Sequence, residues 1–80
     1  MAKLLRENLL RGNAREYQLK DGRFVIVSRA DTSDYGDEVM VFESDGEGRV
    51  VSYSELYCAR ACYGDDMSDE AALKALEGEE

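Results

Sequence analysis

The 80-residue chain lacks histidine, proline and tryptophan and contains only two cysteines. Histidine is the usual general base near neutral pH and the most common metal ligand, so its absence leaves catalysis to carboxylates, lysines or tyrosines. Two cysteines without histidine do not complete the four ligands of a structural zinc site. These absences favour a binding protein over an enzyme, and we expect no catalytic residue, no metal and no cofactor.

The chain also lacks a long apolar run. Its N-terminal segment carries four leucines, but charges at Arg6, Glu7 and Arg11 interrupt the apolar stretch that a signal peptide requires. No other run approaches the length of a membrane span. We therefore expect a soluble, cytoplasmic protein that does not bind a membrane and whose thiols are reduced.

Chain length limits both the number of domains and the stability. A chain this short buries only about 60% of its unfolded surface, which leaves no area for a second core. Residues 1–80 are therefore predicted to form a single domain. At roughly 0.05–0.15 kcal/mol per residue, the free energy of unfolding is about 4–12 kcal/mol, so few buried polar or strained sites are tolerated.

The spacing of apolar residues predicts an α+β fold in three parts. Residues 1–12 have leucines near helical spacing and are predicted to form a short N-terminal helix or arm. Residues 14–53 are predicted to form a small antiparallel sheet, a meander of about four strands. Residues 54–78 are predicted to form short helices in the C-terminal third. The expected strands are 14–20, 23–29, 38–43 and 49–53.

Turn and cap residues support this division. Asp21-Gly22 between two β-prone runs favours a hairpin turn. Ser68 is placed to cap a helix that begins at Asp69 and ends at Gly78. The two middle strands are apolar on both sides, which indicates that both faces of the sheet are covered.

The two cysteines fall within a helix that is expected between Tyr53 and Gly64. Cys58 and Cys62 would then lie one turn apart on the same helical face. We interpret both as small residues in the core or just beneath the surface. A metal site shared between molecules and a redox response are the alternatives.

Charge is divided unevenly along the chain. Residues 1–30 contain seven Lys and Arg against three Asp and Glu, whereas residues 31–80 contain three against fifteen. An acidic half within a Debye length repels a polyanion, so direct binding of nucleic acid by the basic half is not expected. The basic half can instead pair with the acidic half inside the molecule.

Tyrosines are interleaved with acids in the second half of the chain. Carboxylates on a rigid sheet can occupy positions equivalent to phosphates, and exposed tyrosines make good interface anchors. Such a surface fits the basic nucleic-acid groove of another protein. The alternative is that the acids confer solubility and the tyrosines fill the core. The residues predicted to bind a partner are Asp31, Asp34, Tyr35, Asp37, Glu38, Asp45, Glu47, Asp65 and Asp66.

The start of this acidic region is also similar to a calcium-binding loop. Asp31 would stand at the first position and Gly36 at the sixth. However, Tyr35 and Phe42 occupy positions at which that loop requires oxygen ligands. A solvated loop is therefore predicted there, without a bound metal.

Two stretches of the chain resemble small uncharacterised proteins of bacteriophages. The first, from Asp37 to Leu56, combines a strand ending in Phe, an acidic Gly turn, a Val strand and an aromatic-Ser-Glu-Leu helix start. The second is Asp69-Glu-Ala-Ala-Leu73. Tyr53 stands where that pattern commonly has Trp. The resemblance implies a phage-encoded protein, similar in size and acidity to anti-CRISPR and anti-restriction inhibitors, which share no single fold and so assign no residue roles here.

These observations give one leading hypothesis and two alternatives. The first is an inhibitor that binds a host protein or ribonucleoprotein complex in the host cytoplasm and blocks its basic DNA-binding surface. The second is a non-enzymatic structural or regulatory module, with a homodimer as one form, that docks through its basic N-terminal segment. An enzyme that uses Cys58 or a carboxylate pair ranks third, because no base, cofactor loop or metal constellation supports it.

Overall fold

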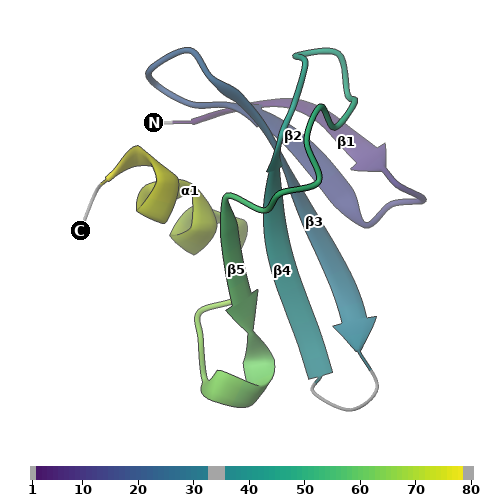
Figure 1. The fold of residues 1–80 in the computed structure, drawn as a ribbon, viewed down its shortest axis with the longest axis vertical. Helices are drawn as coiled ribbons and strands as arrows, with labels where there is room; N and C mark the ends of the chain where they lie inside the picture. Colours follow the sequence, from purple (N-terminus) through teal and green to yellow (C-terminus); the bar gives the residue numbers. More distant parts are fainter. Residues whose placement is uncertain (1, 33–35, 79–80) are drawn as a thin grey trace.

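In the computed structural model, which describes residues 2–32 and 36–78, five antiparallel strands form one sheet and an α-helix packs against it (Figure 1). The strands lie side by side in chain order, as in a meander. The elements are β1 (Lys3–Leu9), β2 (Ala14–Gln18), β3 (Phe24–Thr32), β4 (Gly36–Glu43), β5 (Tyr57–Arg60), the 3₁₀ turn η1 (Ala61–Tyr63) and α1 (Asp69–Glu77).

The predicted N-terminal helix is wrong, because this segment forms the edge strand β1. Leu4 lies opposite Tyr17 and Arg6 lies opposite Glu16 in the antiparallel pair with β2. A helix of so few residues is marginal on its own, whereas pairing with β2 satisfies the backbone. The register shifts twice along β1, and such irregularities protect an edge strand from pairing with another chain.

The prediction of four strands, with the last at 49–53, is also wrong. That segment contributes only an isolated bridge between Ser44 and Val50. The fifth strand, β5, lies where a helix was expected and pairs with β4, so that Ala59 is opposite Val39 and buried. The cysteines therefore do not share a helical face: Cys58 is half-buried in β5, and Cys62 is exposed in η1.

The expected C-terminal helix is confirmed as α1. The Ser68 hydroxyl accepts a hydrogen bond from the Ala71 amide at 3.2 Å, and Gly78 ends the helix with a φ of 72°. Ala72 and Leu73 lie on its buried side. Within residues 2–32 and 36–78, no helix is long and apolar enough to span a bilayer.

The core lies between α1 and one face of the sheet, which we call the helix face. It is formed by side chains from β3, β4 and α1 together with Leu19. Those from the two strands are Val25, Val27, Val39 and Val41. Because side chains alternate along a strand, these valines share one face and their neighbours point to the other.

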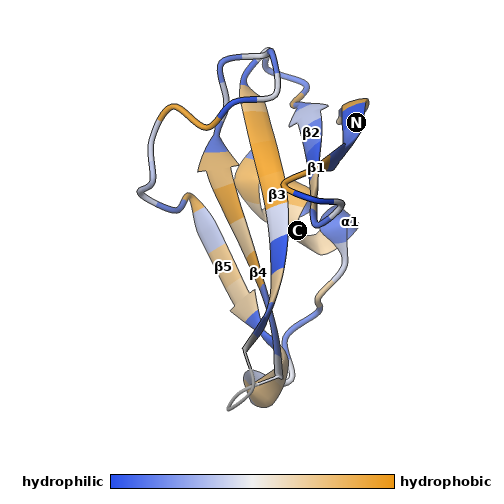
Figure 2. Ribbon diagram, turned by 90° about the vertical axis from the view of Figure 1, so that its right-hand side faces the viewer, coloured by the Kyte–Doolittle hydropathy of each residue, from blue (hydrophilic) through white to orange (hydrophobic). Residues whose placement is uncertain are grey.

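The opposite face carries the connection between β4 and β5, residues 44–56, which we call the β4–β5 loop. Figure 2 shows this loop on the side of the sheet away from α1. Ile26 and Glu16 are 1% and 0% exposed, although neither belongs to the core beneath the helix. The β4–β5 loop therefore covers part of the second face.

Candidate functional site

Four of the predicted partner-binding acids lie at one end of the sheet. Asp31 and Asp37 are directly opposite each other in the β3–β4 pair, and Glu38 follows in register with Ala30. Figure 2 shows that β3 and β4 are hydrophobic toward one end and become hydrophilic toward this one. Asp65 belongs to the segment that follows η1. We call Asp31, Asp37, Glu38 and Asp65 the acidic end.

The turn η1 lies beside this end of the β3–β4 hairpin (Figure 1). A Cβ atom at Gly36 would be 3.6 Å from the Ala61 Cβ, which shows how closely the two segments approach. The Asp65 carboxylate accepts a hydrogen bond from the Arg60 amide at 3.0 Å. This contact holds the segment that carries Asp65 against the end of β5.

Glu38 differs from its acidic neighbours because it has partners within the protein. Its carboxylate lies 3.5 Å from the Arg60 guanidinium and accepts a hydrogen bond from the Cys58 thiol at 3.2 Å. Burial, with a smaller contribution from Glu38, raises the pKa of Cys58. The thiol therefore stays protonated and poorly nucleophilic near neutral pH.

Asp31 and Asp37 differ from Glu38 in their surroundings. Both are exposed, and no Lys or Arg within residues 2–32 and 36–78 forms an ion pair with either of them. Two like charges directly opposite on neighbouring strands destabilise a sheet. The register therefore places two carboxylates at opposite positions of the β3–β4 pair.

Replacement of Asp31 and Asp37 by Asn is expected to stabilise the isolated protein. The change removes the like-charge contact but keeps the shape of both side chains, so the gain should fall within the roughly 0.2–1 kcal/mol typical of cross-strand pairs. The midpoint of urea unfolding measures it, at low and high salt. The gain should shrink as salt rises, and a loss of stability would show that the two carboxylates have structural partners.

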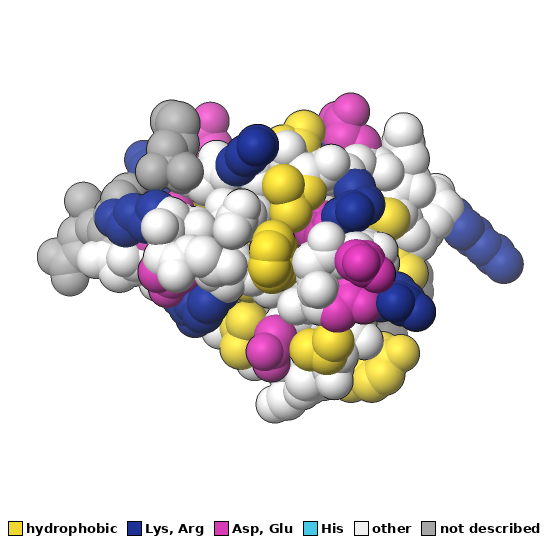
Figure 3. Space-filling model, turned by 90° about the horizontal axis from the view of Figure 1, so that it is seen from above, with side chains coloured by type: hydrophobic (Ala, Val, Ile, Leu, Met, Phe, Trp, Pro, Cys, Tyr) yellow, Lys and Arg dark blue, Asp and Glu magenta, His cyan; other side chains and the backbone are white. Residues whose placement is uncertain are grey.

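The structure separates the remaining predicted acids from this site. Asp45 and Glu47 lie in the β4–β5 loop, where Arg49 contacts their carboxylates at 3.0 Å and 3.5 Å. Hydrogen bonds from the Glu47 and Arg49 amides, with the charge of Arg49, lower the pKa of Asp45. Figure 3, a view onto the end of the sheet that carries the β4–β5 loop, shows acidic side chains beside basic ones.

The other predicted residues, Asp66, Asp34 and Tyr35, do not extend the acidic end. The Asp66 carboxylate accepts a hydrogen bond from the Ser68 amide at 3.0 Å in the turn before α1, and this bond lowers its pKa. Asp34 and Tyr35 lie outside the described residues. Of the predicted residues, the structure therefore brings Asp31, Asp37, Glu38 and Asp65 to one end of the sheet, with Glu38 on the face opposite Asp37.

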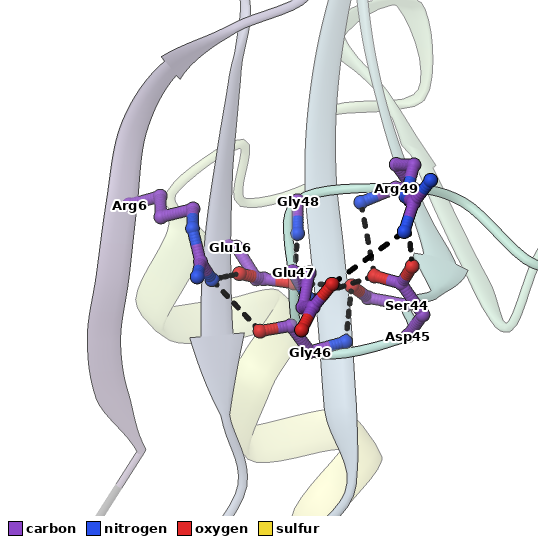
Figure 4. Close-up of polar contacts among 8 residues, drawn as sticks. All are labelled: Arg6, Glu16, Ser44, Asp45, Gly46, Glu47, Gly48 and Arg49. Atoms are coloured by element: carbon purple, nitrogen blue, oxygen red, sulfur yellow. Dashed lines mark hydrogen bonds and ion pairs between the residues drawn. The ribbon is translucent and has the colours of Figure 1, made fainter.

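Sequence reasoning missed a buried carboxylate at Glu16. Figure 4 shows that Arg6, the Ser44 hydroxyl and the Gly48 amide all donate hydrogen bonds to it, the last at 2.9 Å. Arg6 also donates to the Gly46 carbonyl at 2.8 Å. Burial raises the pKa of Glu16, but these three donors outweigh it, so the pKa lies below its usual value. Glu16 thereby fastens the first half of the β4–β5 loop to the sheet.

A second carboxylate, Asp69, fastens α1 to the helix face. It accepts hydrogen bonds from the Tyr17 hydroxyl at 2.7 Å, from Arg29 at 2.9 Å and from Arg15 at 3.1 Å. Burial opposes ionisation of Asp69, but these donors dominate and lower its pKa. Burial, followed by Asp69, raises the pKa of Tyr17 to about 12. The basic and acidic halves of the chain therefore do pair, at the junction between sheet and helix.

Within residues 2–32 and 36–78, no group of three or more Cys, Asp or Glu side chains is placed to hold a metal ion. Comparisons of the chain with protein-family models, with curated proteins and with solved structures found no match.

Proposed function

We propose that the protein is a small inhibitor that uses its acidic end to cover a basic, nucleic-acid-binding surface of a partner complex. The observation that carries this proposal is the uncompensated cross-strand pair of Asp31 and Asp37. A like-charge contact costs stability in the free protein, and binding to Lys or Arg side chains would turn this cost into attraction. The resemblance to phage proteins makes a CRISPR effector complex the first candidate partner.

The backbone beneath these carboxylates suits such a role. Asp31 and Asp37 project from paired strands, and the neighbouring Asp65 is held by its bond to the Arg60 amide. Charges fixed on paired strands lose little freedom on binding, which limits the entropic cost of association. Opposite charge on the partner would also speed the encounter and make it sensitive to salt.

The alternative, docking through the basic N-terminal segment, has less support. Within residues 1–12, Arg6 is already paired with Glu16. The segment is also the edge strand of the sheet, so it is not a separable arm. Deletion of residues 1–12 would remove β1 and the Arg6 contact to Glu16, and a loss of binding would then have no simple interpretation.

A pull-down tests the proposal. The tagged protein is incubated with a lysate that contains CRISPR effector complexes, washed at low and at high salt, and challenged with competing double-stranded DNA. We expect a basic nucleic-acid-binding complex that is retained at low salt and displaced by salt or by DNA. Recovery of only neutral partners, bound equally at both salt concentrations, would contradict the proposal.

A further inference from the structure

The second half of the β4–β5 loop is an exposed apolar arch. Val51, Tyr53 and Leu56 are 54%, 87% and 44% exposed, so three of the largest exposed apolar side chains of the described chain fall within six positions. Loops of this length without regular structure are uncommon in small domains and are often binding loops. We call residues 51–56 the arch.

The arch is held at both of its ends. The Val51 amide donates to the Glu43 carbonyl at 2.9 Å, and the Leu56 amide donates to the Val41 carbonyl at 2.7 Å. The preceding turn is fixed from below by Glu16, through Ser44 and Gly48 (Figure 4). Tyr53 therefore stands in the middle of a short segment whose ends are both bonded to β4. A tyrosine presented in this way loses little freedom when it is buried by a partner.

A hollow lies at the base of the same loop. It has a volume of about 330 Å³, and both ends of the loop, Ser44 and Leu56, line it together with Phe24. Arg23, Val25 and Glu43 complete its lining. Arg23 is paired with Asp21 at 2.8 Å, so its charge is already balanced. An exposed apolar segment beside a hollow of mixed polarity can hold an aliphatic side chain together with basic neighbours.

The charges around the arch determine which partner fits. Glu55 lies within it and Glu43 at its base, while Arg49 on the preceding turn is paired with Asp45 and Glu47. A symmetric contact with a second copy would place this acidic border against itself, and like charges at a symmetric interface oppose association. Glu43 and Glu55 instead complement the positive charge of Lys and Arg.

We propose that the arch and the adjoining hollow bind a basic amphipathic helix of a partner protein, whose apolar stripe covers Val51, Tyr53 and Leu56. The lysines or arginines that border the stripe contact Glu43 and Glu55. This surface lies on the β4–β5 loop, at the end of the sheet opposite the acidic end (Figure 1). The inference goes beyond the proposed function and does not depend on it.

A peptide titration followed by backbone amide NMR tests this inference on the full chain. The probe is a short helical peptide of Leu and Lys with one apolar stripe, and the matched control has Glu in place of every Lys. We expect the Leu/Lys peptide to shift the amides of residues 51–56 and to bind about tenfold or more tightly than the Leu/Glu peptide.

Variants assign this binding to the arch. Val51→Ser with Tyr53→Ser should weaken it by about tenfold or more, because buried aromatic anchors dominate such contacts. Tyr63→Ser is the control, since Tyr63 is 73% exposed on η1 and lies outside the arch. Both variants change exposed side chains and should remain folded.

Three outcomes would overturn the inference. Shifts confined to residues 36–38 and 65–66 would mean that the lysines bind only the acidic end, which would leave the proposed function standing. Equal binding of the Leu/Glu peptide would contradict the charge argument. Without peptide, amide signals of residues 51–56 that shift with protein concentration would identify the occupant of the arch as a second copy of the protein.

Discussion

Replacement of Glu16 by Ala is expected to lower the free energy of unfolding by about 3–4 kcal/mol, which is a large part of the roughly 4–12 kcal/mol available to a chain of this size. The variant leaves the Ser44 hydroxyl and the Gly48 amide without their acceptor beneath the β4–β5 loop. Buried donors without partners cost about 1–3 kcal/mol each. Urea unfolding followed by far-UV circular dichroism measures the loss.

Two further variants show whether the effect arises from this site. Glu16→Gln keeps the size and one acceptor oxygen, so its loss of stability should be intermediate. In this variant, hydrogen exchange should become faster at the Gly46 and Gly48 amides than at the amides of the sheet. Glu7→Gln is the control, because Glu7 on β1 is 57% exposed and its ion pair with Arg15 is long, at 3.8 Å. A stability of Glu16→Ala within error of the control would refute the anchoring role.

Replacement of Asp69 by Ala is expected to cost about 2–3 kcal/mol at neutral pH, because three donors lose a charged acceptor at the junction of α1 and the sheet. Tyr17 is affected most, since its hydroxyl lies 2.7 Å from the carboxylate and its side chain packs against the core. Glu70→Ala is the control, being an exposed acid in the same first turn of α1. Chemical unfolding of both variants against the parent protein gives the comparison.

The difference between the parent protein and Asp69→Ala should depend on pH. The pKa of Asp69 is lowered in the folded state, so its contribution is fully present above the unfolded pKa of about 3.9 and is lost as the pH falls through the folded value. The two proteins should therefore converge in stability below about pH 4. A difference that stays constant down to lower pH would show that the carboxylate charge is not responsible.

Local signals in the sequence predicted some elements correctly. Ser68 and Gly78 mark the ends of α1, and the structure confirms both. The Asp21-Gly22 hairpin is confirmed as well, although only Gly22 has a positive φ, at 96°. In each case a few neighbouring residues determine the backbone conformation, so no distant contact is needed to predict it.

The predictions that failed depended on contacts between distant parts of the chain. The leucines of β1 have near-helical spacing, but pairing with β2 outweighs that preference, as tertiary context commonly does. Tyr57–Arg60 becomes a strand because β4 offers an unpaired edge. Glu16 appears as a solvent-facing residue in its own strand, and its partners Ser44 and Gly48 are 28 and 32 positions away. No local pattern near Glu16 indicates that these residues meet.

The arrangement of the candidate site also depends on contacts that the sequence alone does not show. Acidic composition identified the acids, but only the register of β3 and β4 shows that Asp31 faces Asp37. Only the fold shows that Arg49 pairs with Asp45 and Glu47 at the other end and offsets part of their charge. Opposite charges that are neighbours in space have small fields at a distance, so these two acids contribute less to recognition than their number suggests.

The most direct test of the central claim compares two variants that lose the same charge at opposite ends of the sheet. One carries Asp31→Asn with Asp37→Asn, and the other carries Asp45→Asn with Glu47→Gln. Their affinities for the complex recovered in the pull-down are measured against the parent protein at low salt. We expect the first variant to bind about tenfold or more weakly while being more stable, and the second to bind almost as well as the parent. Equal affinities of the two variants would mean that only net charge matters, and would contradict the assignment of the acidic end.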